Sequence, residues 1–340
     1  YYHPGPDSPE IRYMLERRGA LGGSLPKRIV RPVRVDLPEE SAFAEFAQGS
    51  GKVRVSTTIA FVRLLRNLLR DRHLGKRVVP IIPNEARTFG MDPLFKEVGI
   101  YSPLGQRYTP VDAETLMPYR EATDGQVLEE GITEAGSMAS FMAAGTSYAT
   151  HAEPLVPFYI FYSMFGFQRT GDQMWACADA RARGFLLGAT AGRTTLNGEG
   201  LQHEDGHSHI LATVVPTIRA YDPAFPYETA VIVKDGLRRM LRAGEDVYYY
   251  LTLYNEDLVM QPMPAGVEDG ILRGMYLFKK GDGDGRRRVT LLGSGSIMSE
   301  VLRAQELLRE RGVTADVWSV TSYQLLRNEA LEAERWSRLH

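Results

Sequence analysis

The sequence predicts an α/β protein: a mainly parallel sheet with helices on both faces, followed by part of a smaller α/β unit. Three observations support this fold class. Short apolar strands alternate with amphipathic helices, which favours a mainly parallel sheet covered on both faces. A segment rich in glycine and charge, residues 266–285, then separates a second run of the same pattern. The chain has 340 residues, enough for about two domains of ordinary size.

The predicted elements follow one another in a regular order. Ser56 caps a helix whose apolar residues recur at helical spacing as far as Leu69, and the apolar run at 77–83 is typical of a buried strand. Further strands are predicted at 158–162, 185–189, 219–221 and 247–251, and further helices at 134–148, 172–183 and 230–241. The smaller unit is predicted to hold strands at 288–292 and 315–320 and a helix at 298–311.

Three polar residues, Glu85, Ser163 and Asp222, directly follow predicted strands. Ligands of parallel sheets lie beyond the carboxyl ends of the strands, so we expect these residues along one rim that faces a site. The polar segment 104–119 is a long loop with one glycine and two prolines, and we expect it to close over that site.

The chain divides into four predicted parts. They are a surface linker at 1–50, the main α/β domain at 51–260, a second linker at 261–285, and the truncated start of the smaller α/β domain at 286–340. The chain begins without methionine and stops in a charged run, so we expect it to be part of a longer polypeptide.

Composition narrows the possible partners. Forty lysines and arginines nearly balance 42 aspartates and glutamates, so no global charge favours nucleic acid or an anionic membrane. No apolar run approaches the roughly 20 residues that a membrane span needs. The single cysteine, Cys177, excludes an internal disulfide, suits a reducing compartment and is expected in the core. We expect a cytoplasmic protein that binds small molecules and other protein chains.

Glu134 is the first candidate for catalysis. It follows Gly131-Ile132-Thr133 and opens an alanine-rich run, 135–146. A carboxylate at the start of an apolar helix lies in low dielectric, where it can hold or share a proton near neutral pH. The alternative is that Glu134 only complements the positive end of the helix dipole.

A second candidate cluster concentrates histidines and acids within a dozen residues. Its members are His203, His207, His209, Glu199, Glu204 and Asp205. The string HEDGH matches the H-E-x-x-H pattern of zinc proteases, but zinc needs both histidines on one continuous helix, and Gly206 interrupts the pair. We therefore favour an acid/base or substrate-binding role. A metal-dependent hydrolase built on His203 and His207 remains the alternative function.

Aromatic residues are dense around the strand predicted at 158–162. They are Phe158, Tyr159, Phe161, Tyr162, Phe165 and Phe167. Such a cluster normally belongs to a core, and at a strand end it also suits a platform for a flat heterocycle.

Three strings identify a family. They are EARTFGM at 85–91, FYIFYSMFGFQR at 158–169 and TTLNGEGLQHEDGHSH at 194–209. Together they resemble the homodimeric bacterial pyruvate dehydrogenase E1 component, a thiamine diphosphate enzyme of the transketolase-like class. The resemblance covers the middle, pyrimidine-binding domain and the first part of the C-terminal domain. It implies that the amino-terminal domain, which holds the diphosphate and Mg²⁺, is absent from this chain.

The resemblance implies a role for each candidate. Glu134 hydrogen-bonds N1′ of the aminopyrimidine, so that the 4′ nitrogen can take the C2 proton of the thiazolium. Phe165 stacks on the pyrimidine, and Ile132 also contacts the cofactor. Tyr162 lies at the cofactor too, and both Tyr162 and His203 reach the substrate-derived intermediate.

Two further implications concern the dimer. Glu85 matches an acid in a carboxylate network that joins the two sites, but Asn84 stands where the family usually has aspartate, which weakens that network. The segment 104–119 matches a mobile active-centre loop.

The activity implied is oxidative decarboxylation of pyruvate with acetyl transfer to the lipoyl domain of an E2 acyltransferase. Active sites of this class form between two chains, so we expect this chain alone to supply the pyrimidine half and not to turn over pyruvate. A non-catalytic scaffold, kept for its dimer surface, is a third possibility.

Overall fold

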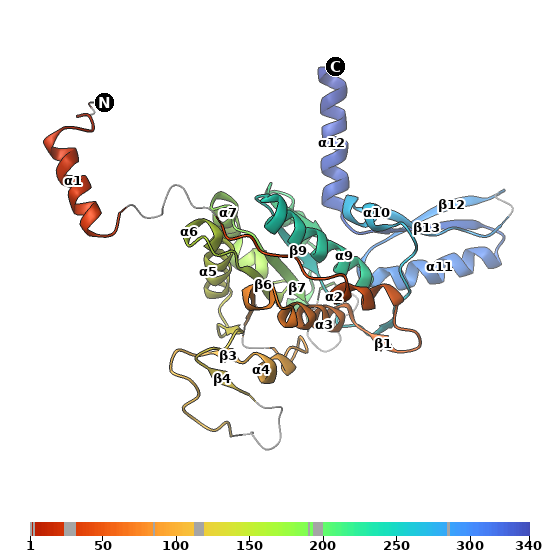
Figure 1. Ribbon diagram of the computed structural model, residues 1–340. Coiled ribbons are helices and arrows are strands. Elements are labelled where there is room, and N and C mark those ends of the chain that lie inside the picture. The colour runs from red at the N-terminus through yellow and green to blue at the C-terminus, as the bar shows by residue number, and fades with distance from the viewer. Residues whose placement is uncertain are drawn as a thin grey trace.

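A computed structural model describes residues 2, 4–23, 32–83, 86–111, 119–189, 191–192, 200–283 and 286–340 (Figure 1). Among these residues the main sheet has six strands, all parallel, in the order β5-β2-β6-β7-β9-β8. The strands are β2 (Val78–Ile82), β5 (Leu128–Glu129), β6 (Val156–Tyr162), β7 (Phe185–Ala189), β8 (Ile218–Tyr221) and β9 (Tyr248–Thr252). The predicted mainly parallel sheet is confirmed.

Helices cover both faces of this sheet, as predicted. On one face lie α3 (Thr57–Arg70) and α9 (Pro226–Leu237), and on the other α5 (Glu134–Gly145) and α7 (Gly166–Asp179). The two faces are separated because successive strand residues point to opposite sides: Phe158 packs with the first pair of helices and Tyr159 with the second. Cys177 lies in the second layer and is fully buried, as expected of a core cysteine.

Local sequence accounts for where these helices begin. Ser56 accepts a hydrogen bond from the Ile59 amide at 3.1 Å, which confirms the predicted cap of α3. Helix α7 begins at Gly166, six residues before the predicted start at Asp172. Thr170 has non-helical backbone angles (φ −131°), so the predicted start lies just beyond this kink. A π-helical turn, Arg238–Ala243, continues α9.

A second, mixed sheet of three strands, in the order β11-β13-β12, packs beside the first. Its elements are α10 (Glu268–Arg273), β11 (Met275–Lys279), β12 (Arg288–Gly293), a 3-10 turn (Gly295–Ile297), α11 (Met298–Glu310), β13 (Thr314–Val320) and α12 (Tyr323–Leu339). The predicted elements of this unit are confirmed. In addition, α10 and the antiparallel strand β11 lie within the range 261–285 that we predicted as a linker, because its glycine-rich end masks a short apolar strand.

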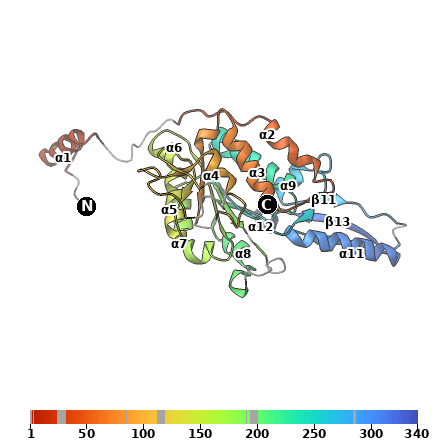
Figure 2. The same ribbon diagram turned by 90° about the horizontal axis from the view of Figure 1, so that it is seen from below.

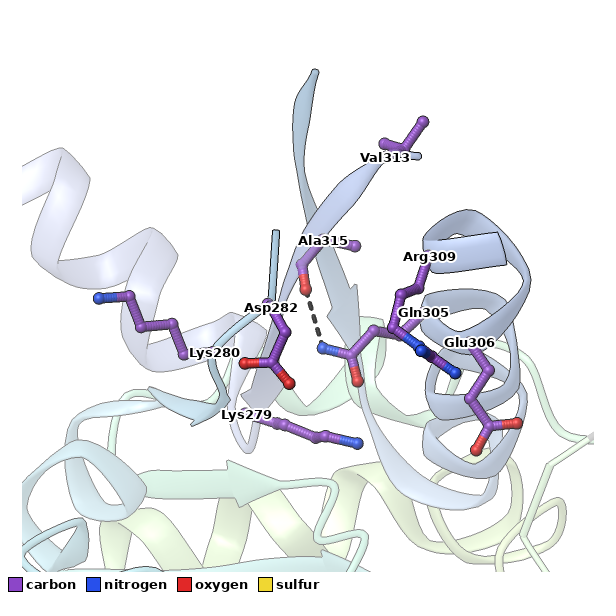
Figure 3. Close-up of a pocket in the computed structure, with 9 residues that line it drawn as sticks. Lys279, Lys280, Asp282, Gln305, Glu306, Arg309, Val313 and Ala315 are labelled. Carbon is purple, nitrogen blue, oxygen red and sulfur yellow. Dashed lines mark hydrogen bonds between the residues drawn. The ribbon is translucent and has the colours of Figure 1, made fainter. Parts of the chain in front are cut away.

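Figure 3 shows how α11 is fixed on β13 in this unit. The buried amide of Gln305 donates to the Ala315 carbonyl at 2.8 Å. Beside it lies a small crevice of about 70 Å³ whose charged lining includes Lys279, Asp282 and Arg309.

The range 1–50, also predicted as a linker, contains short helices. They are α1 (Pro9–Ala20), α2 (Ser41–Ala44) and a 3-10 turn (Glu45–Gln48). Helix α1 buries no residue and lies away from the sheets in both views (Figure 1, Figure 2).

The remaining elements are short. They are β1 (Arg54–Val55), a 3-10 turn (Gly75–Arg77), α4 (Pro93–Glu97), β3 (Ile100–Tyr101), β4 (Glu121–Ala122), α6 (Ser147–Thr150), a 3-10 turn (Leu201–His203), α8 (Ser208–Ala212) and β10 (Leu258–Val259). Strands β3 and β4 flank the loop 104–119, whose described residues form neither helix nor strand. Among the described helices, none has the length and apolar character needed to cross a membrane.

A buried carboxylate joins the two sheets. Glu228, in the first turn of α9, accepts hydrogen bonds from the amides of Ala224 (2.6 Å) and Phe225 (3.2 Å). It also accepts from the Tyr276 phenol of β11 and the Ser319 hydroxyl of β13, each at 2.7 Å. Burial raises the pKa of Glu228, and these four donors limit the rise.

Candidate functional site

Glu134 is the first residue of α5, the helix that follows the edge strand β5. Thr133 caps the helix by accepting from the Gly136 amide at 3.2 Å, which fixes the backbone at Glu134. The Glu134 side chain is only 13 % exposed, and its Oε1 accepts a hydrogen bond from Arg169 Nη1 at 2.6 Å. This acid is therefore largely withdrawn from water and bound to one half-exposed cation.

Arg169 connects Glu134 to an aromatic ring. Its guanidinium carbon lies 4.2 Å from the centre of the Phe165 ring, so one planar cation both stacks on Phe165 and binds Glu134. Sequence reasoning missed Arg169. The signal was present, because Arg169 follows Phe165 by four residues, the spacing at which side chains meet on a helix.

Glycine sets the position of Phe165. Gly166 begins α7 directly above the Phe161 ring, and a β-carbon there would overlap the ring atoms. Phe165 itself is the residue before the helix, and its amide donates to the Tyr162 carbonyl at 2.8 Å in a tight turn after β6. The close approach of α7 to the sheet thus places Phe165 at the carboxyl end of β6.

Three predicted site residues meet edge to face. The ring centres of Tyr162 and His203 are 4.7 Å apart, those of Phe165 and His203 are 5.1 Å apart, and those of Tyr162 and Phe165 are 6.2 Å apart. The Phe89 ring also packs on Tyr162, with ring centres 5.2 Å apart. The structure therefore brings Tyr162, Phe165 and His203 into one aromatic cluster, which Arg169 connects to Glu134.

Other predicted residues lie elsewhere. Ile132 is 74 % exposed and contacts solvent in the single chain. Glu85 and Asn84 lie outside the described residues. Of the six aromatics considered as a platform, four belong to the core, and they are Phe158, Tyr159, Phe161 and Phe167. Only Tyr162 and Phe165 lie at the strand end.

The histidine-rich segment folds as a turn and not as one helix. Asp205 accepts from the amides of His207 (3.1 Å) and Ser208 (3.0 Å) and from the Ser208 hydroxyl, so the chain bends between His203 and His207. Burial alone would raise the pKa of Asp205, but these hydrogen bonds outweigh burial and hold the pKa below its usual value.

This geometry does not favour a metal centre. The described part of the chain holds no group of three or more histidine, cysteine or acidic side chains arranged around a common point. His203 ends a 3-10 turn and His207 precedes α8, so the two do not share a helix face as the zinc pattern requires.

The loop 104–119 is tied at its base by phenols and carboxylates. Tyr119 donates to Glu129 (3.0 Å) or Glu121 (3.2 Å), and Tyr108 donates to Glu121 (3.0 Å). Burial raises the pKa of Glu129, which lies at the end of β5, five residues before Glu134. The described ends of the loop are therefore fixed to β4 and β5.

The fold defines the class of protein. A transketolase from Leishmania mexicana superimposes with a TM-score of 0.66 at 15 % identity, covering 86 % of this chain and 38 % of that chain. A transketolase from Campylobacter jejuni gives 0.64 at 16 % identity, covering 94 % and 42 %. The chain thus has a transketolase-like fold, as the predicted fold class stated.

Sequence comparison identifies the family. A model of the "Pyruvate dehydrogenase E1 component middle domain" matches residues 34–261, and one of the "Transketolase-like TK C-terminal domain" matches residues 274–336. The chain belongs to the pyruvate dehydrogenase E1 family, which confirms the resemblance found in its sequence.

Curated relatives give the extent of the match. The pyruvate dehydrogenase E1 component of Pseudomonas aeruginosa is 54 % identical over 100 % of this chain and 39 % of its own length. Those of Mycobacterium tuberculosis and Escherichia coli are 54 % and 50 % identical, each over 98 % of this chain and 37 % and 38 % of their lengths. This chain spans about two fifths of the length of these relatives.

Proposed function

We propose that this chain is the middle part, with the start of the C-terminal domain, of a pyruvate dehydrogenase E1 subunit. The proposed activity is oxidative decarboxylation of pyruvate with acetyl transfer to the lipoyl group of an E2 acyltransferase. The family membership supports this proposal, and the geometry around Glu134 is the observation that carries it. The metal-dependent hydrolase has no comparable support, because His203 and His207 lie on different elements.

The residues present fit the aminopyrimidine of thiamine diphosphate. In the single chain the Arg169 guanidinium makes the contacts that we propose for the aminopyrimidine. It is planar, carries N–H groups, stacks at 4.2 Å on Phe165 and binds Glu134 at 2.6 Å. An aminopyrimidine is also flat and carries N–H and ring nitrogen atoms. An acid and an aromatic face at this spacing therefore suit it.

When bound, thiamine diphosphate supplies a carbon nucleophile and an electron sink for the loss of CO₂. The role of this chain is to bind, orient and exchange protons. Glu134, largely withdrawn from water, would hold a proton shared with N1′ of the aminopyrimidine. Phe165 would present its ring face, and Tyr162 and His203 would lie towards the substrate. Ile132 would contact the cofactor in the assembled dimer.

The remaining parts of the proposed site come partly from segments outside this chain and partly from Glu85 and the loop 104–119. The diphosphate and Mg²⁺ would be held by an amino-terminal domain, and a second copy of the full protein would complete each site in a cytoplasmic homodimer. Glu85 would belong to an acidic network between the two sites, weakened by Asn84. The loop 104–119 would close the entrance.

This chain by itself should not turn over pyruvate. A related arrangement supports the proposal, because a split-gene transketolase described as an inactive β4 tetramer matches 79 % of this chain and 72 % of its own chain with a TM-score of 0.53. We also propose that the two domains lie near 51–260 and 286–340. Strand β11 belongs to the second of them.

Replacing Glu134 in the full-length dimer tests this function. We expect Glu134→Gln to slow deuterium exchange at C2 of bound thiamine diphosphate by about 100-fold or more, the usual range for loss of a general acid–base group. Asp172→Asn is a matched control, because Asp172 lies on α7, is exposed and loses the same charge. Exchange in Glu134→Gln as fast as in Asp172→Asn would refute the assignment.

A further inference from the structure

Hydrogen bonds connect His209 through Thr252 to Asp222. Its Nε2 lies 2.9 Å from the hydroxyl of Thr252, the last residue of β9. Thr252 in turn donates to Asp222 Oδ1 at 2.6 Å, and the Tyr254 phenol donates to the same oxygen at 2.5 Å. Thr252 is 2 % exposed, so the middle of this relay (His209–Thr252–Asp222) is sheltered from water.

The hydrogen count of the relay fixes the histidine tautomer. A threonine hydroxyl has one proton to donate, and an ionised carboxylate can only accept. Because Thr252 gives its proton to Asp222, its oxygen must accept from His209, which places a proton on Nε2. In the neutral ring Nδ1 is then the acceptor. None of the described residues forms a hydrogen bond with that nitrogen.

His209 lines a cleft between α8 and the start of α12. The cleft has a volume of about 360 Å³ and is lined by His209, Asp222, Tyr323 and Arg327, among others. His209 belongs to α8, beside the main sheet, whereas Tyr323 and Arg327 belong to α12 of the smaller unit. Its ring also packs against Tyr250 at 5.3 Å, which limits rotation.

Asp222 is itself held by the smaller unit. Its amide donates to the Thr321 carbonyl at 2.8 Å, and the Gly295 amide donates to its carbonyl at 3.2 Å. Thr321 follows β13 and Gly295 follows β12, so two loops of the second sheet fix the backbone of Asp222. The docking of the smaller unit therefore sets the position of the carboxylate on which the relay depends.

We propose that Asp222 and Thr252 are positioning residues that fix His209 as the Nε2–H tautomer and leave its Nδ1 as a proton acceptor that serves the cleft between the domains. The relay gives His209, one of the three clustered histidines, an orienting partner of the kind that acid–base histidines use. The link of this cleft to the reaction rests on the proposed function, whereas the tautomer does not.

Neutron diffraction from crystals of the full-length protein in D₂O tests the tautomer directly. At pH 8 we expect deuterium on His209 Nε2, none on Nδ1, and the Thr252 deuterium directed at Asp222. Deuterium on Nδ1, with the Thr252 deuterium directed at His209, would overturn the proposal. This result is independent of turnover.

A pair of variants tests the role in turnover. Thr252→Val removes the hydroxyl at nearly constant shape, and Thr252→Ser keeps it. In the full-length dimer we expect Thr252→Val to lower kcat/KM for the 2-oxo acid by about 10-fold and Thr252→Ser to stay within about 2-fold, as for loss of one orienting hydrogen bond. Equal values for the two variants, with unchanged melting temperature, would refute the positioning role.

The two proposals can fail separately. Wild-type protein that binds thiamine diphosphate but turns over no 2-oxo acid would count against the proposed function, and the diffraction result would still decide the tautomer. Normal turnover with the wrong tautomer would count against the relay alone.

Discussion

Two glutamates in this chain occupy the first turn of a helix at the rim of the same sheet, yet their surroundings differ. Glu228 is fully buried and accepts from four donors, two from the backbone and two from side chains of the second sheet. Glu134 is slightly exposed and binds one half-exposed arginine through one oxygen. Helix position alone therefore does not decide what an acid does.

The difference lies in the number of acceptor sites that remain. A carboxylate accepts up to about four hydrogen bonds, and those of Glu228 are all used within the protein. Its role is to hold the two sheets together. Within the described residues only Arg169 binds Glu134, so this carboxylate keeps acceptor capacity that can bind a ligand. The count of donors separates a structural acid from a functional one.

Removing Glu228 should have the largest effect on stability. Glu228→Ala leaves four buried donors without a partner, so we expect a loss of about 3–5 kcal/mol in the free energy of unfolding. Glu134→Ala should cost about 1 kcal/mol or less, because its ion pair is half exposed. Urea denaturation of both variants measures the difference in the free energy of unfolding. Equal losses in the two variants would contradict the distinction between a structural and a functional glutamate.

Arg169 should affect binding more than stability. Arg169→Ala removes both the ion pair with Glu134 and the stacking on Phe165, and so frees both groups for the cofactor. We therefore expect the thiamine diphosphate affinity of the full-length dimer to rise by about 10-fold. Arg169→Lys keeps the charge without the planar group and separates the two contributions. If the lysine variant matches the wild type, stacking has no role; if the alanine variant does, Arg169 is dispensable.

The pKa shift of Glu228 predicts a pH dependence of defined sign. Because burial raises its folded-state pKa, the unfolded chain ionises first as the pH rises. The contribution of Glu228 is therefore fully present below about pH 4.5, its ordinary value, and is lost as the pH rises through the folded value.

The measurement compares unfolding free energies of wild type and Glu228→Gln from pH 4.5 upward. The wild-type value should fall relative to the variant with increasing pH. Asp205→Asn provides the opposite case, because hydrogen bonds lower the pKa of Asp205 and its contribution is lost as the pH falls through the folded value. The same sign for both acids would contradict the assignment.

The sequence predicts those parts of the fold and the site that depend on contacts between residues close in sequence. It does not predict the parts that depend on contacts between distant residues. Strands such as Phe185–Ala189 are apolar throughout, so local pattern was enough to place them. Strand β11 is short and next to a glycine-rich segment, so only its pairing with β13 makes it a strand. The relay from His209 to Asp222 joins residues that are far apart in sequence, which no local pattern contains.

The residues of the candidate site also differ in whether the sequence alone could identify them. The strings around Glu134, Tyr162, Phe165 and His203 identified the candidates, and the structure brings the last three together. Arg169 was missed because a cation on a helix surface is ordinarily solvated, and its role is visible only once α5 and α7 are packed side by side.

Replacing Ile132 should have the smallest effect on stability. Ile132 lies two residues before Glu134, so the two residues can be compared directly. It is 74 % exposed, so Ile132→Ala should change the unfolding free energy of this chain by less than about 0.5 kcal/mol. In the full-length dimer, the same change should weaken thiamine diphosphate binding several-fold if Ile132 packs on the cofactor. Val214→Ala, another exposed apolar residue, is the control. Unchanged cofactor affinity in Ile132→Ala would confine the site to Glu134 and the aromatic cluster.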